Sequence, residues 1–282
     1  MAINRSLWNK EFTLDKTPLW TCPYCNQGQL IGNKTNIKII ESENSKKLRE
    51  DSSWEQIWIS GSFGGVLQCI NPHCKESIQI IGKMSTLDHC DTNEYGEQIS
   101  NIYFTETLLP VAFFPTLNIF PIHEDVPEEI KNAIIETFKL YWIDMSSCAN
   151  KIRTVVELIL DKQGVDRTNS IKKYIPLNNK IEKFEANKPE EAEFMKAIKW
   201  IGNEASHKLN TVTKDDVLDA LEMLENLTTK LYEKDSESQT RKLKEKRNVI
   251  NEIEKPLSHK IEKEIKANSD DIGNPVELLD EI

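Results

Sequence analysis

The stretch LLPVAFFPTLNIFPIHEDVP, residues 108–127, separates two parts of the sequence that have different patterns. It contains four prolines in twenty residues, from Pro110 to Pro127. Proline lacks a backbone N–H donor and disfavours a helical conformation in the residue before it, so this stretch is not expected to be a helix. We predict an extended connector over residues 109–126, laid over a neighbouring domain.

Before the connector, short apolar runs are separated by turn residues. The runs are WEQIWIS (54–60), GGVLQC (64–69), ESIQIIG (76–82) and ISNIYF (99–104), with Gly, Asn, Asp and Ser between them. This pattern is typical of strands joined by turns. We therefore predict a small β domain over residues 1–108.

After the connector, apolar residues recur every three or four positions, as on the buried face of a helix. Pro127 and Pro189 are each followed by two glutamates, which favours a first helical turn because carboxylates stabilise the positive helix end. Gly164 stands where a helix commonly ends. We predict an all-α bundle over residues 127–232, which makes the fold class α+β. Its helices are expected from Pro127, from Ser147 to Gln163, from Leu177 to Phe184, from Pro189, and from Lys214 to Tyr232.

The last segment, residues 233–282, is rich in charged residues and contains no aromatic residue. Such a segment buries too little apolar area to offset the entropy that it loses on ordering, which favours a solvated tail. Apolar residues recur every four positions from Ile253 to Ile265, so the alternative is a thin helix that docks on a partner protein.

The overall charge limits the classes of function. The chain has 282 residues and a formal net charge of −10, from 36 Lys+Arg against 46 Asp+Glu. This balance argues against non-specific nucleic-acid binding through a positive surface, while a local basic groove stays open. No apolar run approaches the ~18 to 20 residues of a membrane span, and the amino terminus MAINRSLWNK has no apolar signal region. We expect a cytoplasmic protein that does not cross a membrane.

Four cysteines form two close pairs, CPYC at residues 22–25 and CINPHC at residues 69–74. Thiols stay reduced in the cytosol, which favours a metal over disulfides. A short turn presents two thiolates to one ion, and zinc prefers four such ligands at tetrahedral corners. We predict a zinc-ribbon-like domain whose structural Zn²⁺ has no open position for catalysis. The predicted ligands are Cys22, Cys25, Cys69 and Cys74.

Two alternatives to this four-cysteine zinc site remain. The four thiols can be empty or redox-active, and His73 can replace Cys74 as a ligand. Cys90 and Cys148 have no partner at ligand spacing, so we expect them to be small buried residues.

A second group of polar residues lies on the predicted helices. In AIKWIGNEASH, residues 197–207, Asn203 and His207 share one helix face with Ser206 beside them. Gly202 costs about 1 kcal/mol relative to alanine inside a helix, so we expect a neighbouring backbone or side chain to approach it closely.

The earlier helical segment NKIRTVVEL, residues 150–158, places Arg153 and Glu157 on one side of an apolar helix. Taken alone, these two residues predict an ion pair between positions i and i+4. A structural interpretation is that they join Asn203 and His207 in a buried polar network that fixes the helix register.

These segments carry a family resemblance. NKIRTVVELILDKQGV, KIEKF, AIKWIGNEASH and the leucine-rich last helix, preceded by FFPTLNIFPIHEDVPEEI, closely resemble the bacterial family called domain of unknown function 4145. Members often carry an amino-terminal pair of cysteine knuckles and are grouped with the HEPN superfamily, an all-α bundle that tends to dimerise. Many HEPN proteins are metal-independent ribonucleases in toxin, CRISPR and anti-phage systems. The resemblance thus implies a HEPN-like homodimer that acts on RNA in defence or stress.

The resemblance also suggests roles for individual residues. The HEPN motif is similar to Arg-Asn-x-x-x-x-His on one helix, so Asn203 and His207 match it while Gly202 replaces its arginine. It implies that His207 is the general acid or base and that an arginine neutralises the phosphate. We expect Arg153 to supply that arginine, with Gly202 making room for its guanidinium. The candidate catalytic residues of this degenerate endoribonuclease motif are His207, Arg153, Asn203, Ser206 and Glu157.

Two other functions compete with an action on RNA through the bundle. One is a non-enzymatic dimeric adaptor that binds a partner protein, which the acidic charge, the missing motif arginine and the charged tail favour. The other is a nucleic-acid-binding ribbon, but its lysines are interrupted by glutamates and have no aromatic stacking residues, as on a solvated face. The residues of that basic region are Lys34, Lys38, Lys46, Lys47 and Arg49.

Overall fold

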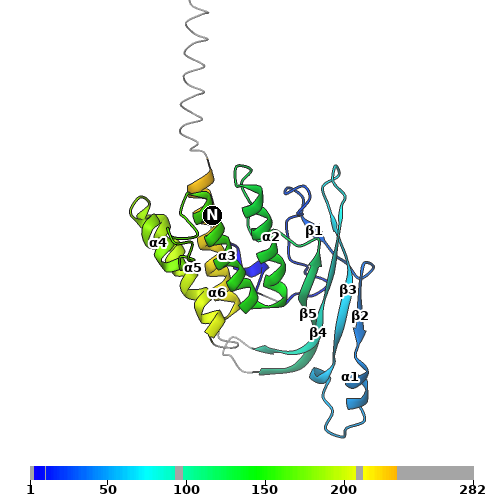
Figure 1. Cartoon of the computed structure of the whole chain (residues 1–282). Coiled ribbons are helices and arrows are strands. Elements are labelled where there is room, and N and C mark those ends of the chain that lie inside the picture. The colour runs from blue at the N-terminus through cyan, green and yellow to red at the C-terminus, as the bar shows by residue number, and fades with distance from the viewer. Residues whose placement is uncertain (1–2, 10, 93–97, 208–211, 234–282) are drawn as a thin grey trace, which may run out of the picture. The chain divides into compact units, whose positions relative to one another are not determined.

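The computed structural model describes residues 3–9, 11–92, 98–207 and 212–233, and for residues 90–92, 98–102, 206 and 207 it describes the backbone alone. The described residues up to Tyr232 belong to one compact unit, in which a sheet and a group of helices lie side by side (Figure 1). The sheet contains β1 (Leu30–Ile31), β2 (Ile37–Glu41), β3 (Ser60–Cys69), β4 (Ser77–Thr92) and β5 (Gln98–Phe114), with η1 (Arg5–Leu7), α1 (Glu43–Leu48) and η2 (Gln56–Trp58) as short helices. The main helices are α2 (Glu128–Ile143), α3 (Met145–Lys162), α4 (Leu177–Glu185), α5 (Pro189–His207) and α6 (Lys214–Tyr232). The predicted mixed α+β class is confirmed.

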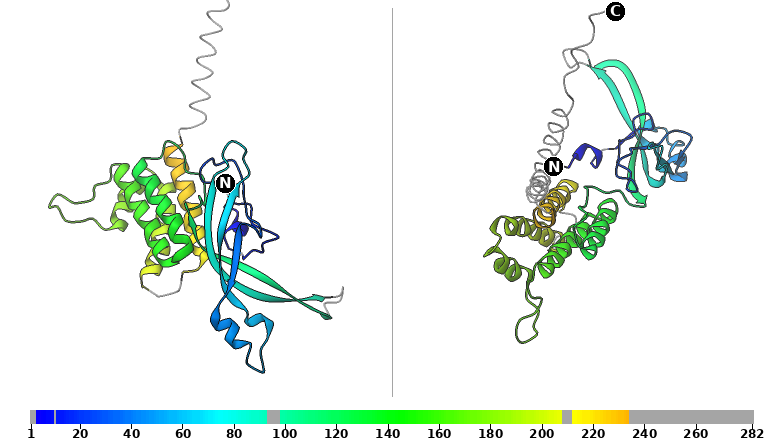
Figure 2. Two further views of the ribbon diagram at one scale, coloured as in Figure 1. Left: turned by 90° about the vertical axis from the view of Figure 1, so that its right-hand side faces the viewer. Right: turned by 90° about the horizontal axis from the view of Figure 1, so that it is seen from above.

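The sheet is antiparallel in its described part. Its strands are ordered β1-β3-β4-β5, and β2 pairs with another part of β3. The paired strands β4 and β5 extend beyond the rest of the sheet (Figure 2). Three of the predicted runs lie in β3, β4 and β5, whereas WEQIWIS forms the short helix η2 before β3 begins at Ser60. The apolar residues of that run do not alternate, so they do not define one face of a strand.

Strand β5 continues to Phe114 and therefore includes the first residues of the predicted connector. Pro110 lies opposite Gly82, beside a register shift between Ile81 and Gly82. Proline is tolerated at such a position because β5 is the last strand in the order and a bulge relaxes the pairing there.

The main helices begin and end close to the predicted positions. Pro127 precedes α2, Pro189 begins α5, and Gly164, with a φ of 85°, follows the end of α3. Helix α3 begins two residues earlier than predicted, because the Asp144 carboxylate accepts hydrogen bonds from the amides of Ser146 and Ser147 and caps the helix. Among the described residues, no helix is both long and apolar enough to cross a membrane.

Aromatic side chains join the sheet to the helices. Phe113 of β5 packs against Trp142 of α2 with ring centroids 4.7 Å apart, and Trp20 packs on Phe113 at 5.1 Å. Trp8 reaches the same cluster, 5.9 Å from Trp142. The hydrophobic core therefore runs continuously from the sheet into the helices.

The amino-terminal segment, for which the sequence analysis gave no detail, is held between these parts. The Trp20 indole donates to the carbonyl oxygen of Leu7, and the Tyr141 hydroxyl donates to Asn9 Oδ1 at 3.0 Å. Arg5 forms ion pairs with carboxylates of α6. The predictions for residues 234–282 concern residues outside the described part of the chain.

Candidate functional site

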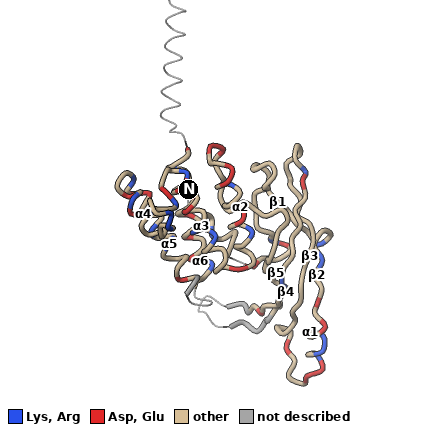
Figure 3. The backbone as a smooth tube through the Cα atoms, viewed as in Figure 1, with Lys and Arg blue, Asp and Glu red and all other residues tan. Residues whose placement is uncertain are grey.

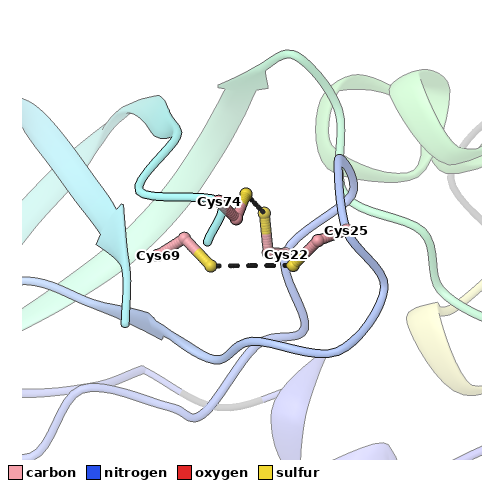
Figure 4. A group of neighbouring side chains, drawn as sticks. All are labelled: Cys22, Cys25, Cys69 and Cys74. Carbon is pink, nitrogen blue, oxygen red and sulfur yellow. Dashed lines mark hydrogen bonds between the residues drawn. The ribbon is translucent and has the colours of Figure 1, made fainter. Parts of the chain in front are cut away.

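The four cysteines predicted as ligands form one cluster (Figure 4). Their sulfur atoms all lie within 4.8 Å of one another, with 3.9 Å between Cys22 and Cys74 and 3.8 Å between Cys25 and Cys69. A bond of about 2.3 Å from each sulfur to a tetrahedral zinc ion places the sulfurs about 3.8 Å apart. A disulfide would need about 2.05 Å, so the geometry suits one metal ion shared by four separate thiolates.

Two turns of similar design present these cysteines. The amide of Asn26 donates to the carbonyl oxygen of Cys22 in the first turn, and the amide of Lys75 donates to that of Asn71 in the second. Asn26 and Lys75 each follow the second cysteine of their pair, and both have a positive φ, 51° and 54°. In each turn the left-handed residue reverses the chain directly after the second ligand.

Strand β1 brings the two turns together. Leu30 lies opposite Cys69 in the pairing of β1 with β3, and the amide of Ile70 donates to the carbonyl oxygen of Gln29 at 3.0 Å. An isolated bridge between Thr21 and Gln29 closes the first turn. The ligands therefore sit on backbone that is hydrogen-bonded on both sides.

Gly28 is a residue of this centre that the sequence analysis missed. A Cβ atom at this position would lie 2.4 Å from Cys69 Sγ, so only glycine fits without a shift. Its amide also donates to Cys25 Sγ at 3.3 Å. The signal in the sequence was a glycine three residues after the second cysteine of a pair.

The two turns give their thiols different acidities. The backbone amides of Gly28 and Gln27 lower the pKa of Cys25 to about 6, whereas burial raises the pKa of Cys69 to about 12. The hydrogen bonds thus favour the thiolate form of Cys25, whereas burial disfavours the thiolate form of Cys69. This combination is suited to a metal ion, whose charge compensates the remaining ligands.

Among the described side chains, Cys148 and His73 are not part of this cluster. The buried Cys148 thiol donates to the carbonyl oxygen of Thr137 at 3.2 Å, which confirms it as a packing residue. The side chain of Cys90 lies outside the described residues. Within the described part, the metal-ligating group consists of the four cysteines, without His73.

Helices α3 and α5 meet at Gly202, as its position inside a helix predicted. A Cβ atom there would lie 3.2 Å from Arg153 Cβ and 3.3 Å from the carbonyl oxygen of Ala149. Because Gly202 has no side chain, the backbone of Ala149 and the aliphatic part of the Arg153 side chain can pack directly against α5.

Arg153 and Glu157 behave differently from the predicted ion pair. Glu157 accepts a hydrogen bond of 2.8 Å from the Tyr174 hydroxyl, and no ion pair links it to Arg153 among the described side chains. Arg153 Nε is buried and has no hydrogen-bond partner in the same part of the chain. Glu157 therefore pairs with the hydroxyl of Tyr174, which is distant in sequence, in place of the predicted partner Arg153.

The other predicted residues lie on α5. Asn203 is half-buried and directly follows Gly202. The backbones of Ser206 and His207 belong to the last turn of α5, and their side chains lie outside the described part. The structure therefore places Arg153 against the helix that carries Asn203, Ser206 and His207.

The basic region of the β part is paired with acidic residues. Arg49 forms an ion pair with Glu41 at 2.9 Å, and Lys46 with Glu43 at 2.6 Å. Blue and red segments lie close together on and around α1 in Figure 3. This surface has the character of a solvated face.

Two family models match the sequence. Residues 135–267 match the family described as Domain of unknown function (DUF4145), so the resemblance found in the helical segments is confirmed. Residues 10–114, which include all four clustered cysteines, match Domain of unknown function (DUF8608). We found no significant match among curated proteins or among solved structures.

Proposed function

Because residues 135–267 carry a DUF4145 domain, we propose that the chain is a zinc-containing protein whose HEPN-like bundle acts on RNA, by binding or cleaving it. The family resemblance is also the basis for placing this activity in a cytoplasmic defence or stress response.

The metal in this proposal is a structural zinc ion. The donor set consists of four thiols at the spacing that a tetrahedral zinc site requires. Four protein ligands would complete the coordination of the ion, so it would link the two turns and leave no position for a substrate. The candidate RNA site is therefore assigned to the helices.

The observation that carries the RNA proposal is the position of Arg153. Its stem lies against Gly202, the residue that replaces the arginine of the HEPN motif, and its Nε has no hydrogen-bond partner among the described residues. An arginine guanidinium is suited to a phosphate oxygen, because its planar N–H donors match the geometry of the phosphate. His207 follows five positions later on the same helix as Gly202 and would act as the acid or base.

The test is incubation of the zinc-loaded protein with total RNA in magnesium-free buffer containing EDTA. We expect fragments that end in a 2′,3′-cyclic phosphate with the wild type, and intact RNA with His207→Ala and Arg153→Ala. Arg49→Ala, a surface arginine of the β part, is the matched control and should cleave normally. Circular dichroism in the same buffer checks that EDTA leaves the fold unchanged.

A second measurement separates RNA binding from cleavage. If the wild type leaves RNA intact, fluorescence polarisation with a labelled single strand tests the sensing form of the proposal. We expect Arg153→Ala to weaken binding about tenfold, which corresponds to about 1.4 kcal/mol. Equal binding by wild type and Arg153→Ala, together with intact RNA, would reject an action on RNA at this site.

Trp200 supports the alternative of a non-enzymatic dimeric adaptor. This side chain lies on α5 and is 66% exposed, and tryptophan is enriched among the residues that dominate binding at protein interfaces. In the adaptor the bundle forms a homodimer or binds a partner protein. If the bundle is a homodimer, Trp200→Ala should convert the dimer to a monomer in analytical ultracentrifugation. If it binds a partner protein, Trp200→Ala should abolish capture of that partner, whereas a chain truncated after Tyr232 should still capture it.

A further inference from the structure

A cavity lies among the amino-terminal segment, the connector after β5, and α6. It has a volume of about 410 Å³, within the ~300 to 1,000 Å³ that is usual for small-molecule sites. Its apolar lining includes Ile3, Trp8, Ile119 and Phe120, all of which are buried. The cavity is remote in sequence from the α3–α5 contact and plays no part in the proposed action on RNA.

One carboxylate of α6 lines this apolar cavity. Glu225 is only 7% exposed, and its Oε2 is buried without a hydrogen-bond partner among the described residues. Burial raises the pKa of Glu225, as expected for a carboxyl whose charge is poorly solvated. A buried acceptor without a hydrogen-bond partner destabilises a fold, so a donor supplied by a ligand would remove this penalty.

Two cationic side chains near Glu225 already have partners, while the positive charge of the chain's amino terminus acts on Glu225 itself and lowers its pKa, against the larger effect of burial. Arg5 lies close to α6, but its guanidinium pairs with Asp215, Asp219 and Glu222. Lys230, further along α6, pairs with Glu190 at 2.6 Å. Arg5 is thus shared by three carboxylates of α6 and Lys230 pairs with a carboxylate of α5, while Glu225 lies on the wall of the cavity.

The mouth of the cavity is polar. Asn4 and Asn26 are exposed on its edge, and Asn118 Nδ2 donates to Asn26 Oδ1 at 3.2 Å. The cavity thus has a polar rim, an apolar wall and one buried acceptor. Such a site suits a ligand whose apolar part contacts the wall and whose charged group contacts Glu225.

We propose that this cavity binds a small protonated amine with an apolar body, whose ammonium group donates to Glu225. An ammonium supplies the hydrogen-bond donor that Glu225 Oε2 lacks, and its charge is opposite to that of the carboxylate. The amine can belong to a free alkylamine or to the amino terminus of a short peptide, since both present the same group.

The test measures binding of hexylammonium chloride to the full chain without an amino-terminal tag, because Ile3 and Asn4 line the cavity. Fluorine NMR of fluorotryptophan-labelled protein follows the Trp8 signal, assigned with Trp8→Phe. We expect a saturable shift with hexylammonium and a dissociation constant about tenfold higher, or more, in Glu225→Gln. Hexanol, which has the same body without the charge, should bind both proteins more weakly and to an equal degree.

Two further arms make the outcome specific. Glu190→Gln removes an exposed carboxylate of α5 that pairs with Lys230 and does not line the cavity, so it should bind hexylammonium as the wild type does. Leu-Ala-Ala amide, compared with its amino-terminally acetylated form, tests whether the amine can be the terminus of a peptide. The proposal is supported if Leu-Ala-Ala amide binds more tightly than its acetylated form, or if hexylammonium binds more tightly than hexanol. Binding of hexanol equal to that of hexylammonium, an unchanged affinity in Glu225→Gln, or no saturable shift with any amine would overturn it.

Discussion

A methyl group at position 28 would lie 2.4 Å from Cys69 Sγ and 2.8 Å from Asn71 Cβ, inside the contact distance of both atoms. Gly28→Ala should therefore push the two cysteine turns apart and weaken the bond from the Gly28 amide to Cys25 Sγ. We expect zinc affinity to fall about 10- to 100-fold, as for other changes directly behind metal ligands. Competition with a chromophoric chelator measures this affinity.

Gly64→Ala is the matched control for that substitution. The nearest atom that its Cβ would meet is Ile81 Cγ2 at 3.6 Å, an ordinary contact, so the zinc affinity should stay at the wild-type value. Equal affinities for Gly28→Ala and wild type would show that the tight approach at Gly28 does not determine the metal geometry.

At the level of single residues, the sequence predicted what depends on spacing and missed what depends on distant partners. The two cysteine pairs carry their own signal, because each pair forms one local turn. The Tyr174 partner of Glu157 and the cavity position of Glu225 carry none, since each is created by segments far away in the chain. The same reason explains why Gly28 was recognised only from its contact with Cys69.

At the level of elements, the start of α3 gives a pH-dependent prediction. The hydroxyl and amide of Ser147, with the Ser146 amide, lower the pKa of Asp144 below its usual value. The carboxylate thus stabilises the fold above its unfolded pKa, and this contribution is lost as the pH falls through the folded pKa. Asp144→Ala should be about 1 kcal/mol less stable than wild type at about pH 7, and the difference should shrink towards about pH 3.

Urea unfolding over this pH range measures the effect, and Asp144→Asn supplies the comparison. An asparagine cap accepts the same amide hydrogen bonds without a titrating charge. Its stability should therefore approach that of wild type as the pH falls. A constant difference between wild type and Asp144→Ala at every pH would show that the charge of the cap contributes nothing.

The contact between α3 and α5 predicts the effect of a larger side chain at Gly202. A leucine there must displace the backbone of Ala149 or the stem of Arg153, because both lie within 3.4 Å of the point that the leucine Cβ would occupy. We expect Gly202→Leu to lower the free energy of unfolding by about 1–3 kcal/mol. Glu193→Leu adds the same side chain on the exposed face of α5 and should change stability by less than about 0.5 kcal/mol. Equal stability of the two variants would contradict a tight contact.

The helices were more predictable than the strands for a physical reason. Residues of α2 to α6 form their hydrogen bonds within each helix, so their apolar period and their first-turn residues already define the ends. The pairing of Pro110 with Gly82 depends on the register between β4 and β5. The short helix η2 depends on the residues before β3. The predicted connector was therefore too long at its amino-terminal end.

At the level of the whole unit, Trp142 of α2 joins the sheet to the helices through Phe113 and Trp8. A shared core predicts that the sheet with its four clustered cysteines and the helices unfold together, in one cooperative transition. Trp142→Ala should lower the free energy of unfolding by about 3–5 kcal/mol. Phe114→Ala, which removes the neighbouring side chain that is 74% exposed, should leave the transition almost unchanged.

Cooperativity is measured by following two signals in the same guanidinium titration of zinc-loaded protein. Far-ultraviolet circular dichroism reports on the helices, and a chromophoric chelator reports on release of zinc from the four cysteines of the sheet. The two midpoints should coincide in wild type and shift together in Trp142→Ala, because the clustered cysteines and the helices share one core. Release of zinc at a lower denaturant concentration than loss of helix would mean that the cysteine turns open independently, and the interface at Trp142 would then not couple the two parts.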